Sequence, residues 1–334
     1  MENIKLKSFI KDCLNKNPCE HFISYEEPMK EHTTFKVGGP ADCFLRPYGG
    51  GFLLFCADLL ERAHNNKIPV FILGGGANIV VSDKGIRGIV LDITDWKGQI
   101  ETSDEHEIIF NSGTPINKAC EEALSAGFTG LEFLAGMPGT IGGAVYMNAR
   151  CYGSEISDIL NWTEIISYSE RGIKNEKSEV KNENLKTGLI KRIYTNKAGG
   201  FGYKQSPFQS MDSLILSASF KVNKGDKNKI SYVMEKNKTD RKTKGHFLFP
   251  SAGSIFKNNH DFGKPTGAII DELGLKGLKI GGAQVAPFHG NIIINSENAS
   301  AADIRSLINK ITVIVKEKTG FLLEPEVLFA GDWS

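Results

Sequence analysis

The stretch from Gly127 to Gly153 constrains the fold of this chain more than any other part of the sequence. It reads GFTGLEFLAGMPGTIGGAVYMNARCYG and holds seven glycines and one proline among small and apolar residues. A surface loop would be more polar, and closely spaced glycine and proline disfavour a helix over residues 136–143. Glycine admits positive φ and lets a ligand approach bare amides. We therefore expect backbone N–H groups here to contact a large ligand. The alternative is a buried glycine corner in a β-rich core.

A second glycine cluster lies upstream, between apolar runs at residues 70–73 and 79–81. The pattern of strand, triple glycine and strand predicts a hairpin whose tip offers consecutive amides to an anion. It is not a Walker A loop, because no Gly-Lys-Ser/Thr follows. It is not a Rossmann fingerprint either, because GxGxxG is absent. Three successive glycines exceed what an ordinary tight hairpin needs, so a bound pyrophosphate is the favoured interpretation.

Composition excludes several classes of protein. The 334 residues suffice for two or three modest cores, and 40 basic against 39 acidic residues leave a net charge of +1. We therefore expect no nucleic-acid partner. The six cysteines show no CxxC, so we expect reduced thiols and no metal. The N-terminus lacks the apolar core of a signal peptide, and no stretch is long enough to cross a bilayer. These observations predict a cytoplasmic protein without a membrane span.

Hydrophobic spacing predicts further elements. Helices are expected over residues 4–14, 52–64, 116–126, 224–244, 266–273 and 300–319, and strands over residues 88–93, 108–111 and 291–295. The last helix begins with a capping box, Ser300 and Asp303, and ends at Gly320. Residues 171–192 are expected to form a solvated hairpin or excursion. In the extended C-terminal run, Glu324 and Glu326 are expected on one face, opposite Leu323, Val327 and Phe329.

The order of motifs resembles the UDP-N-acetylenolpyruvoylglucosamine reductase (MurB) family. The matching pieces are TTFKVGGPA (33–41), LGGGANIVVSD (73–83), GLEFLAGMPGTIGGAVYMNA (130–149), FGYKQSPF (201–208), PSAGSIFKN (250–258), GLKGLKIGGAQVAPFHGNIIIN (274–295) and LEPEV (323–327). They follow the family order over residues 33 to 330. The long glycine block and SAGSIFKN are the specific signals.

The resemblance implies an α+β chain with an FAD-binding fold of the vanillyl-alcohol-oxidase (PCMH) type. That fold has two subdomains with FAD between them, followed by a C-terminal α/β substrate-binding lobe. We expect residues 1–222 to form the FAD-binding region, with its core at 33–222. Residues 223–334 would form the substrate-binding domain, and the last strand would pack back toward the FAD-binding region. The short path from Ser254 to Gly281 resembles the family type that lacks an extra tyrosine-bearing loop.

The activity implied is an NADPH-dependent reduction of UDP-N-acetylglucosamine enolpyruvate in peptidoglycan precursor synthesis, with FAD carrying hydride. The expected protein is a cytoplasmic monomer with this small-molecule substrate. The resemblance implies that Ser254 donates the proton, that Glu326 acts on the enolate side and that Lys204 stabilises the enolate. Glu326 would need a protonated or shared-proton state, for which Glu324 is a candidate neighbour. The expected substrate-binding residues are Tyr203, Lys257 and Asn258. The expected FAD-binding residues are Gly74, Gly75, Gly76, Ala77, Asn78, Gly139, Thr140, Gly142, Gly143 and Ala144.

Four departures from the family pattern bear on activity. Lys204 stands where the family usually has arginine, whose fork grips a carboxylate with two hydrogen bonds. Arg150 replaces a small glycine, where its charge would either clash or reach a phosphate or carboxylate. Leu328 replaces a common arginine, and Gly245-His246 replaces a Gln-Pro pair.

Two competing interpretations remain. One is another FAD-dependent oxidoreductase of the same cofactor fold, acting on a sugar or hydroxy acid, which would not need SAGSIFKN or LEPEV. The other is a catalytically silent flavin- or nucleotide-binding homologue, suggested by the changes at 150, 204 and 328.

Overall fold

The computed structural model describes residues 2–100, 105–169, 190–195 and 199–334. The chain divides into two compact units. The first unit consists of Met1–Tyr25, Cys43–Gly75 and Gly88–Lys238, and the second of Glu26–Asp42, Gly76–Arg87 and Thr239–Ser334. Two N-terminal segments therefore share a unit with the C-terminal part of the chain. The expected functional border between residues 222 and 223 stays a prediction.

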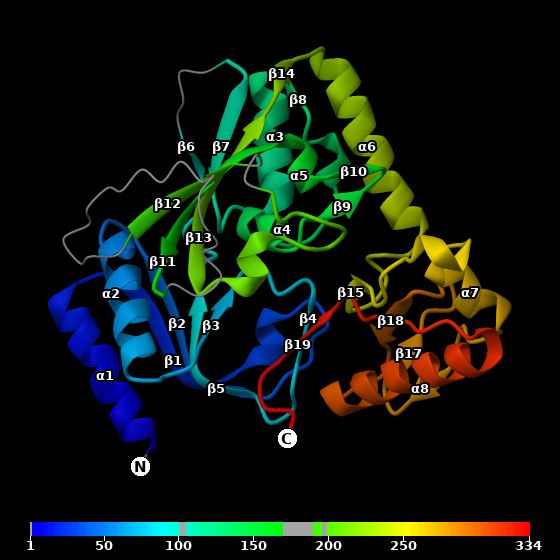
Figure 1. The fold of residues 1–334 in the computed structure, drawn as a ribbon, viewed down its shortest axis with the longest axis horizontal. Helices are drawn as coiled ribbons and strands as arrows, with labels where there is room; N and C mark the ends of the chain where they lie inside the picture. The colour runs from blue at the N-terminus through cyan, green and yellow to red at the C-terminus, as the bar shows by residue number, and fades with distance from the viewer. Residues whose placement is uncertain (1, 101–104, 170–189, 196–198) are drawn as a thin grey trace. The chain divides into compact units, whose positions relative to one another are not determined.

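The first sheet has the strand order β1-β2-β5-β3, and helices α1 and α2 lie against it (Figure 1). Apolar side chains recur at helical spacing in both helices, and Ile10 of α1 and Phe55 and Leu59 of α2 are buried in one core with the sheet. The elements are α1 (Glu2–Lys16), β1 (Glu20–Pro28), β2 (Pro40–Tyr48), α2 (Phe52–Asn65), β3 (Val70–Leu73) and β5 (Ile86–Asp92). The helices expected over residues 4–14 and 52–64 are confirmed.

The second sheet is antiparallel, with the order β12-β11-β13-β7-β6. Helix α3 packs in its core and ends at Gly127, which adopts a φ of 72° at the C-cap. The strands are β6 (Gln99–Ile100), β7 (Glu107–Asn111), β11 (Leu160–Ser167), β12 (Ile190–Thr195) and β13 (Ser213–Lys221), and α3 is Ile116–Ala126. The excursion expected over residues 171–192 lies outside the described residues, except for residues 190–192, which belong to β12.

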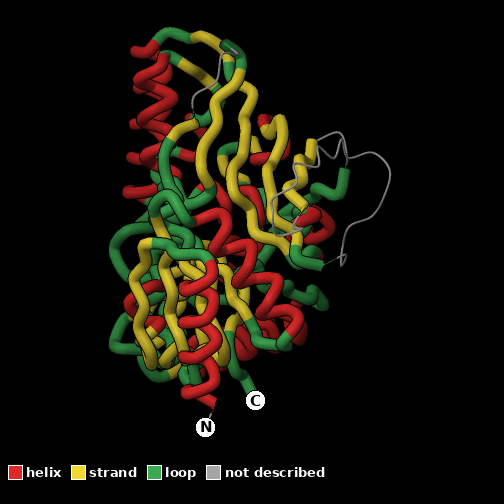
Figure 2. The backbone as a smooth tube through the Cα atoms, turned by 90° about the vertical axis from the view of Figure 1, so that its left-hand side faces the viewer, coloured by secondary structure: helices red, strands yellow, loops and turns green. Residues whose placement is uncertain are grey.

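Short elements complete the first unit and lead into the second. They are β8 (Phe128–Thr129), η2 (Glu132–Leu134), α4 (Ile141–Tyr146), β9 (Arg150–Cys151), β10 (Ser154–Glu155), α5 (Ile156–Ile159), η4 (Pro207–Ser210), β14 (Asn223–Lys224) and α6 (Lys227–Thr243). Figure 2 shows helices and strands mixed through the chain, and the expected α+β class is confirmed.

The second unit is built on an antiparallel sheet with the order β15-β18-β17-β16 and on the long helix α8. Ser300 and Asp303 form the predicted capping box of α8, and Gly320 ends it with a φ of 78°. The elements are η1 (Met29–His32), β15 (Ser251–Ser254), η5 (His260–Phe262), α7 (Thr266–Glu272), β16 (Lys279–Ile280), β17 (Ala283–Val285), β18 (Ile292–Asn295) and α8 (Ala301–Thr319).

The hairpin predicted around the triple glycine is wrong. Strand β3 pairs with β5, whereas β4 (Ile79–Val81) pairs in parallel with β19 (Leu328–Ala330). The glycines therefore carry the chain out of one sheet into another. The prediction failed because β4 pairs with β19, and Asn78 likewise bonds to Glu326, 248 positions away. Local hydrophobic patterns carry no information about such distant pairings. Leu323, Val327 and Phe329 were predicted to share the buried face of the C-terminal run. Leu323 and Val327 are buried, as predicted. The prediction fails for Phe329, which is exposed and packs edge-on against Trp333.

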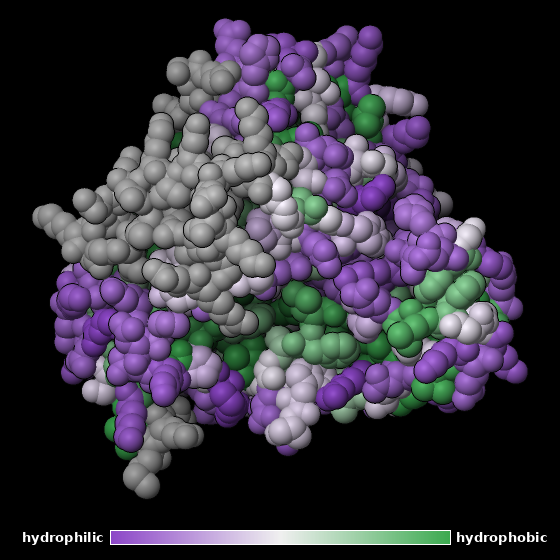
Figure 3. Space-filling view, viewed as in Figure 1, coloured by the Kyte–Doolittle hydropathy of each residue, from purple (hydrophilic) through white to green (hydrophobic). Residues whose placement is uncertain are grey.

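Hydrophobic side chains are exposed in one run directly before β15. Phe247, Leu248 and Phe249 are 55%, 65% and 42% exposed. Figure 3 shows hydrophobic patches interrupting a surface that is otherwise largely hydrophilic.

Within the described ranges, no helix has both the length and the apolar character that crossing a bilayer requires.

Candidate functional site

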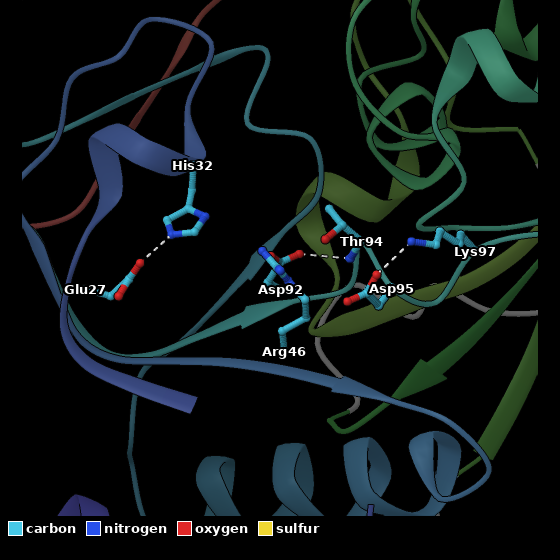
Figure 4. Close-up of polar contacts among 7 residues, drawn as sticks. All are labelled: Glu27, His32, Arg46, Asp92, Thr94, Asp95 and Lys97. Atoms are coloured by element: carbon cyan, nitrogen blue, oxygen red, sulfur yellow. Dashed lines mark hydrogen bonds and ion pairs between the residues drawn. The ribbon is translucent and has the colours of Figure 1, made fainter. Parts of the chain in front are cut away.

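The first glycine run begins at a firmly anchored strand end. Leu73, the last residue of β3, lies opposite Asp92 of β5. The buried Asp92 carboxylate accepts hydrogen bonds from Arg46 Nε–H at 2.7 Å and from the Thr94 backbone N–H at 2.8 Å, and Figure 4 draws the bond between Thr94 and Asp92. A buried carboxylate is stable only when it is paired and hydrogen-bonded. These bonds therefore fix the position of Asp92, and with it the end of β3, after which Gly74 follows.

In the run from Gly74 to Asn78, backbone carbonyl groups accept hydrogen bonds from other described residues, whereas the amides donate none to them. The carbonyl of Gly76 accepts the Thr34 N–H at 3.0 Å, and that of Asn78 accepts the Leu328 N–H at 3.0 Å. Among the described residues, no group accepts a hydrogen bond from the N–H groups of residues 74–78. Gly76 is buried and the other four residues are half-buried. Successive unpaired amides in such a position suit an anionic ligand.

Gly76 is required where it stands. Its φ is 59°, and a Cβ there would lie 2.0 Å from the carbonyl oxygen of His32. His32 is itself held in the second unit, where its Nε2 lies 2.9 Å from Glu27 Oε1 (Figure 4). Any side chain at residue 76 would push this segment away and disturb the free amides.

The second glycine run contains a short helix, which corrects the expectation that these glycines exclude one. Helix α4 starts after Thr140, whose Oγ1 accepts the Gly143 N–H at 3.4 Å. The N–H groups of Ile141 and Gly142 donate to the carbonyls of Thr114 and Ser112. A Cβ on Gly142 would lie 2.8 Å from Ser112 Cβ, so this glycine serves close packing within the protein. Helix propensity alone missed α4 because neighbouring strand ends stabilise its first turn.

Gly143 differs from Gly142 in its surroundings. It is exposed, and a Cβ there would meet only Thr140 Oγ1, at an ordinary 3.5 Å. Within the described part of the chain, the N–H groups of Gly139 and Thr140 donate no hydrogen bond. The second run therefore adds two free amides and an open glycine surface, whereas the amides of residues 141–144 are already paired.

The structure brings the two glycine runs together in the first unit. A Cβ on Gly75 would lie 2.6 Å from Gly139 Cα, and one on Gly74 would lie 2.6 Å from Thr140 Oγ1. Glycine at residues 74 and 75 therefore lets this segment lie directly against Gly139 and Thr140. The free amides of Gly74, Gly75, Gly139 and Thr140 consequently lie in one small region.

Tyr203 and Lys204 occupy the tip of a tight turn. Gly202 and Gln205 exchange backbone hydrogen bonds of 3.1 and 3.0 Å, and Lys204 adopts a φ of 57°. Asn148 Nδ2 donates to the Gly202 carbonyl at 2.9 Å, which ties the turn to the end of the glycine stretch. A left-handed conformation in a non-glycine residue costs energy and is common at functional sites.

Ser254 and Glu326 lie on adjacent backbone segments of the second unit. The Glu326 N–H donates to the Ile255 carbonyl at 2.7 Å, and Phe256 forms a bridge with Pro325. In this antiparallel register Glu326 lies opposite Ile255, so regular alternation directs Ser254 and Glu326 to different faces. The structure brings the two backbones together, but it does not place both side chains in one cavity.

Lys257 and Asn258 have partners within the protein. Lys257 Nζ lies 2.5 Å from Glu324 Oε1, and Asn258 Oδ1 accepts the Thr266 N–H at 2.9 Å. Glu324, the expected acidic neighbour of Glu326, is thus engaged in an ion pair. Leu328 lies in β19 opposite Ile79.

A cavity of about 300 Å³ opens beside Ser254. Its polar lining residues are Ser254, Asn258, Asp271, Lys276, His289 and Asn291. Asn291 is buried, and its amide both donates to and accepts from the backbone of Phe256, at 2.8 and 2.9 Å. Lys276, His289 and Asn291 were missed as site residues. They lie within the quoted 274–295 motif, which was the available signal.

His246 lies near His289, which lines this cavity. Their ring centroids are 6.1 Å apart and the ring planes are inclined by 53°. Burial, followed by the charge of Arg241, lowers the pKa of His246 to about 4. Burial, followed by the charge of Lys244, also lowers the pKa of His289. Gly245 lies against Phe288, where a Cβ would come within 2.5 Å of the ring. This close packing explains why glycine stands at residue 245.

In the part of the chain that the structure describes, no three or more His, Cys, Asp or Glu side chains are grouped so that they could hold a metal ion. All six cysteines are free thiols, and burial raises the pKa of Cys120 to about 12.

Comparison with known proteins covers most of the chain. Residues 244–330 match the family model described as UDP-N-acetylenolpyruvoylglucosamine reductase, C-terminal domain, and residues 56–171 match the FAD binding domain model. The UDP-N-acetylenolpyruvoylglucosamine reductase of Treponema denticola is 42% identical over 326 residues, covering 94% of this chain and 95% of that protein. The protein of the same name from Borrelia garinii is 41% identical over 327 residues, covering 98% and 97%.

A solved structure supports the same relationship. The crystal structure of UDP-N-acetylenolpyruvylglucosamine reductase (MurB) from Thermus caldophilus aligns with a TM-score of 0.68 and 28% identity. The alignment covers 93% of this chain and 99% of that one.

Proposed function

This chain belongs to the UDP-N-acetylenolpyruvoylglucosamine reductase family and is an FAD-dependent oxidoreductase, and we propose the following assignment of its substrate, reductant and residues. It reduces the enolpyruvyl group of UDP-N-acetylglucosamine enolpyruvate to a lactyl ether, with NADPH as the source of electrons. The observation that carries the assignment of the cofactor residues is the run of free amides at residues 74–78.

The residues present fit FAD. Gly74, Gly75, Gly76, Ala77 and Asn78 would hold the pyrophosphate through their N–H groups, because successive backbone donors attract phosphate oxygens. Gly139 and Thr140 add two free donors, and Gly142, Gly143 and Ala144 form the first turn of α4 beside them. Gly143 leaves open space at its surface, so a flat ligand can approach the backbone there.

The chemistry that FAD supplies when bound is hydride transfer from NADPH to the substrate. The protein's own groups handle the charge and the proton. Hydride addition to the terminal enolpyruvyl carbon leaves an enolate, which needs positive or hydrogen-bonding partners placed in advance. Lys204 provides the positive charge and Tyr203 binds the substrate beside it. The strained turn at Lys204 supports this assignment, because strain is kept where position matters.

Ser254 donates the proton to the enolate. A serine hydroxyl is a weak acid, so donation requires a strongly basic acceptor held close to its Oγ. Ser254 lines the cavity with Asn258, which binds the nucleotide sugar. Lys257 contributes through its ion pair with Glu324, which fixes the segment that follows Ser254. Glu326, on the backbone segment that pairs with Ile255, acts on the enolate from a different face than Ser254.

The surroundings of the enzyme follow from the same assignment. The substrate is a small nucleotide sugar, and free thiols suit a reducing compartment, so we place the enzyme in the cytoplasm. We expect a monomer in which residues 1–222 form the FAD-binding region, with Tyr203 and Lys204 also contacting substrate, and residues 223–334 form the substrate-binding domain.

The test is anaerobic stopped-flow absorption of the purified protein. We expect a yellow protein whose flavin is bleached by NADPH and then reoxidised by the enolpyruvyl nucleotide. Reduction without reoxidation by this nucleotide, but with reoxidation by a sugar- or hydroxy-acid-derived acceptor, would identify another flavoenzyme of this fold. A bound flavin that NADPH fails to reduce would identify a silent homologue. A colourless protein that takes up no flavin would overturn the proposal.

A further inference from the structure

Arg150 lies beside the Tyr203–Lys204 turn in the first unit. It is opposite Glu155 in the β9–β10 pair, and its guanidinium carbon lies 5.7 Å from the centroid of the Tyr203 ring. At that distance the ring face attracts the cation. The side chain is thus held over the residue that precedes Lys204.

The guanidinium of Arg150 has hydrogen-bond donors to spare among the described residues. Its ion-pair partner is Glu155, whose Oε2 lies 3.8 Å from Arg150 Nη1, too far for a hydrogen bond. Within the described residues, the guanidinium donates no hydrogen bond. Glu155 is meanwhile satisfied by Asn148 Nδ2 at 3.0 Å and Ser157 Oγ at 2.7 Å. The Tyr203 ring and the Glu155 carboxylate therefore position the guanidinium, while its N–H groups remain available to a ligand.

The surroundings of Arg150 are rigid. Asn148 is fully buried with a φ of 42°, and its side chain joins Glu155, Ser157 and the Gly202 carbonyl. Ser206 Oγ also donates to the Tyr146 carbonyl at 2.7 Å. These bonds lock the hairpin that carries Arg150 to the turn that carries Lys204. A preorganised pair of cations on two tied segments suits an anionic ligand.

We propose that Arg150 is a second anion-binding residue of the substrate site, which takes the carboxylate of the enolpyruvyl group alongside Lys204. The inference rests on the proposed function. Lysine offers a point charge on a flexible stem, whereas arginine grips a carboxylate with two parallel hydrogen bonds. Arg150 supplies the fork that the turn itself lacks. It is 39% exposed, which leaves its guanidinium accessible to substrate.

The test is the affinity of the flavin-loaded protein for the enolpyruvyl nucleotide without NADPH, measured by calorimetry. Arg150→Gln is expected to weaken binding by roughly 10- to 100-fold, the usual value of hydrogen bonds to a charged group. Arg150→Lys is expected to fall between Arg150→Gln and the parent. The same nucleotide sugar without its enolpyruvyl group should bind equally well to all three. The matched control is Arg305→Gln, because Arg305 also stacks on an aromatic ring, at 5.0 Å from Trp333.

Three outcomes would overturn the inference. Arg150→Gln that binds both nucleotides like the parent would show that the guanidinium contacts neither. An equal loss for both nucleotides would assign Arg150 to the diphosphate instead of the carboxylate. A loss accompanied by a lower melting temperature than that of Arg305→Gln, with no rescue in Arg150→Lys, would show a structural role. A parent protein that does not reoxidise with the nucleotide would refute the proposed function separately.

Discussion

Asp83 caps helix α8 from far away in the sequence. Its Oδ1 accepts the Ala301 N–H at 2.8 Å and its Oδ2 accepts the Ala302 N–H at 2.9 Å. A helix leaves its first amides unpaired, and here the carboxylate also opposes the positive end of the helix dipole. The Ser300–Asp303 capping box satisfies the next amide. This contact ties Gly76–Arg87 to the C-terminal part of the chain in one unit.

Replacing Asp83 with alanine should lower the free energy of unfolding by about 1–2 kcal/mol, the usual effect of losing an N-terminal cap. Asp83→Asn should lose less, because an amide oxygen still accepts one hydrogen bond. Urea denaturation measures the change. The control is Asp261→Ala, since Asp261 lies exposed in η5. Equal stability of Asp83→Ala and the control would refute the role.

Local signals predicted the elements well, but they did not predict the distant pairings. The limits of α3 and the caps of α8 were correct because Gly127, Ser300 and Gly320 act on neighbouring residues. The β4–β19 pairing and the Asp83 cap were missed because they join distant residues. Asn291 was also missed, since its bonds to Phe256 exist only in the observed register of β15 and β18.

A side chain at Gly143 should block FAD binding without harming the fold. A Cβ there meets only Thr140 Oγ1 at 3.5 Å, and leucine is favoured over glycine in a helix by about 1 kcal/mol. Gly143→Leu should therefore melt no lower than the flavin-free parent. It should nevertheless retain far less flavin than the parent, as measured by absorption after gel filtration. The control is Gly50→Leu, because a Cβ at Gly50 has no atom within 4 Å. Full flavin content in Gly143→Leu would exclude this surface from the cofactor site.

Ser254→Ala should separate the two half-reactions. Reduction of FAD by NADPH does not need the hydroxyl and should keep its rate. Reoxidation by the enolpyruvyl nucleotide should slow by roughly 10²- to 10⁴-fold, the usual contribution of a positioned proton donor. Ser251→Ala in the same strand serves as the control. An equal loss in both half-reactions would contradict proton donation by Ser254.

Lys204→Arg should maintain or raise turnover, because arginine holds a carboxylate with two hydrogen bonds. Lys204→Gly removes the charge while relieving the left-handed φ of 57°, so it separates charge from backbone strain. We expect Lys204→Gly to lose turnover while melting no lower than the parent. Steady-state kinetics with the enolpyruvyl nucleotide measures both variants. A large drop in Lys204→Arg would mean that the site is built around lysine.

His246 should make the protein less stable in mild acid. Burial, with Arg241, His289 and Lys244 adding to it and Asp240 opposing it, lowers the pKa of His246 to about 4 in the folded state. An unfolded histidine titrates near pH ~6.5, so between about pH 6.5 and 4 the unfolded chain binds a proton that the folded chain does not. The free energy of unfolding should therefore fall as the pH drops through this window, and this group should have no effect above pH ~7. His246→Gln should flatten that slope in urea titrations at several pH values, whereas His260→Gln, at an exposed position, should leave it intact. A parent-like slope in His246→Gln would assign the acid sensitivity to other groups.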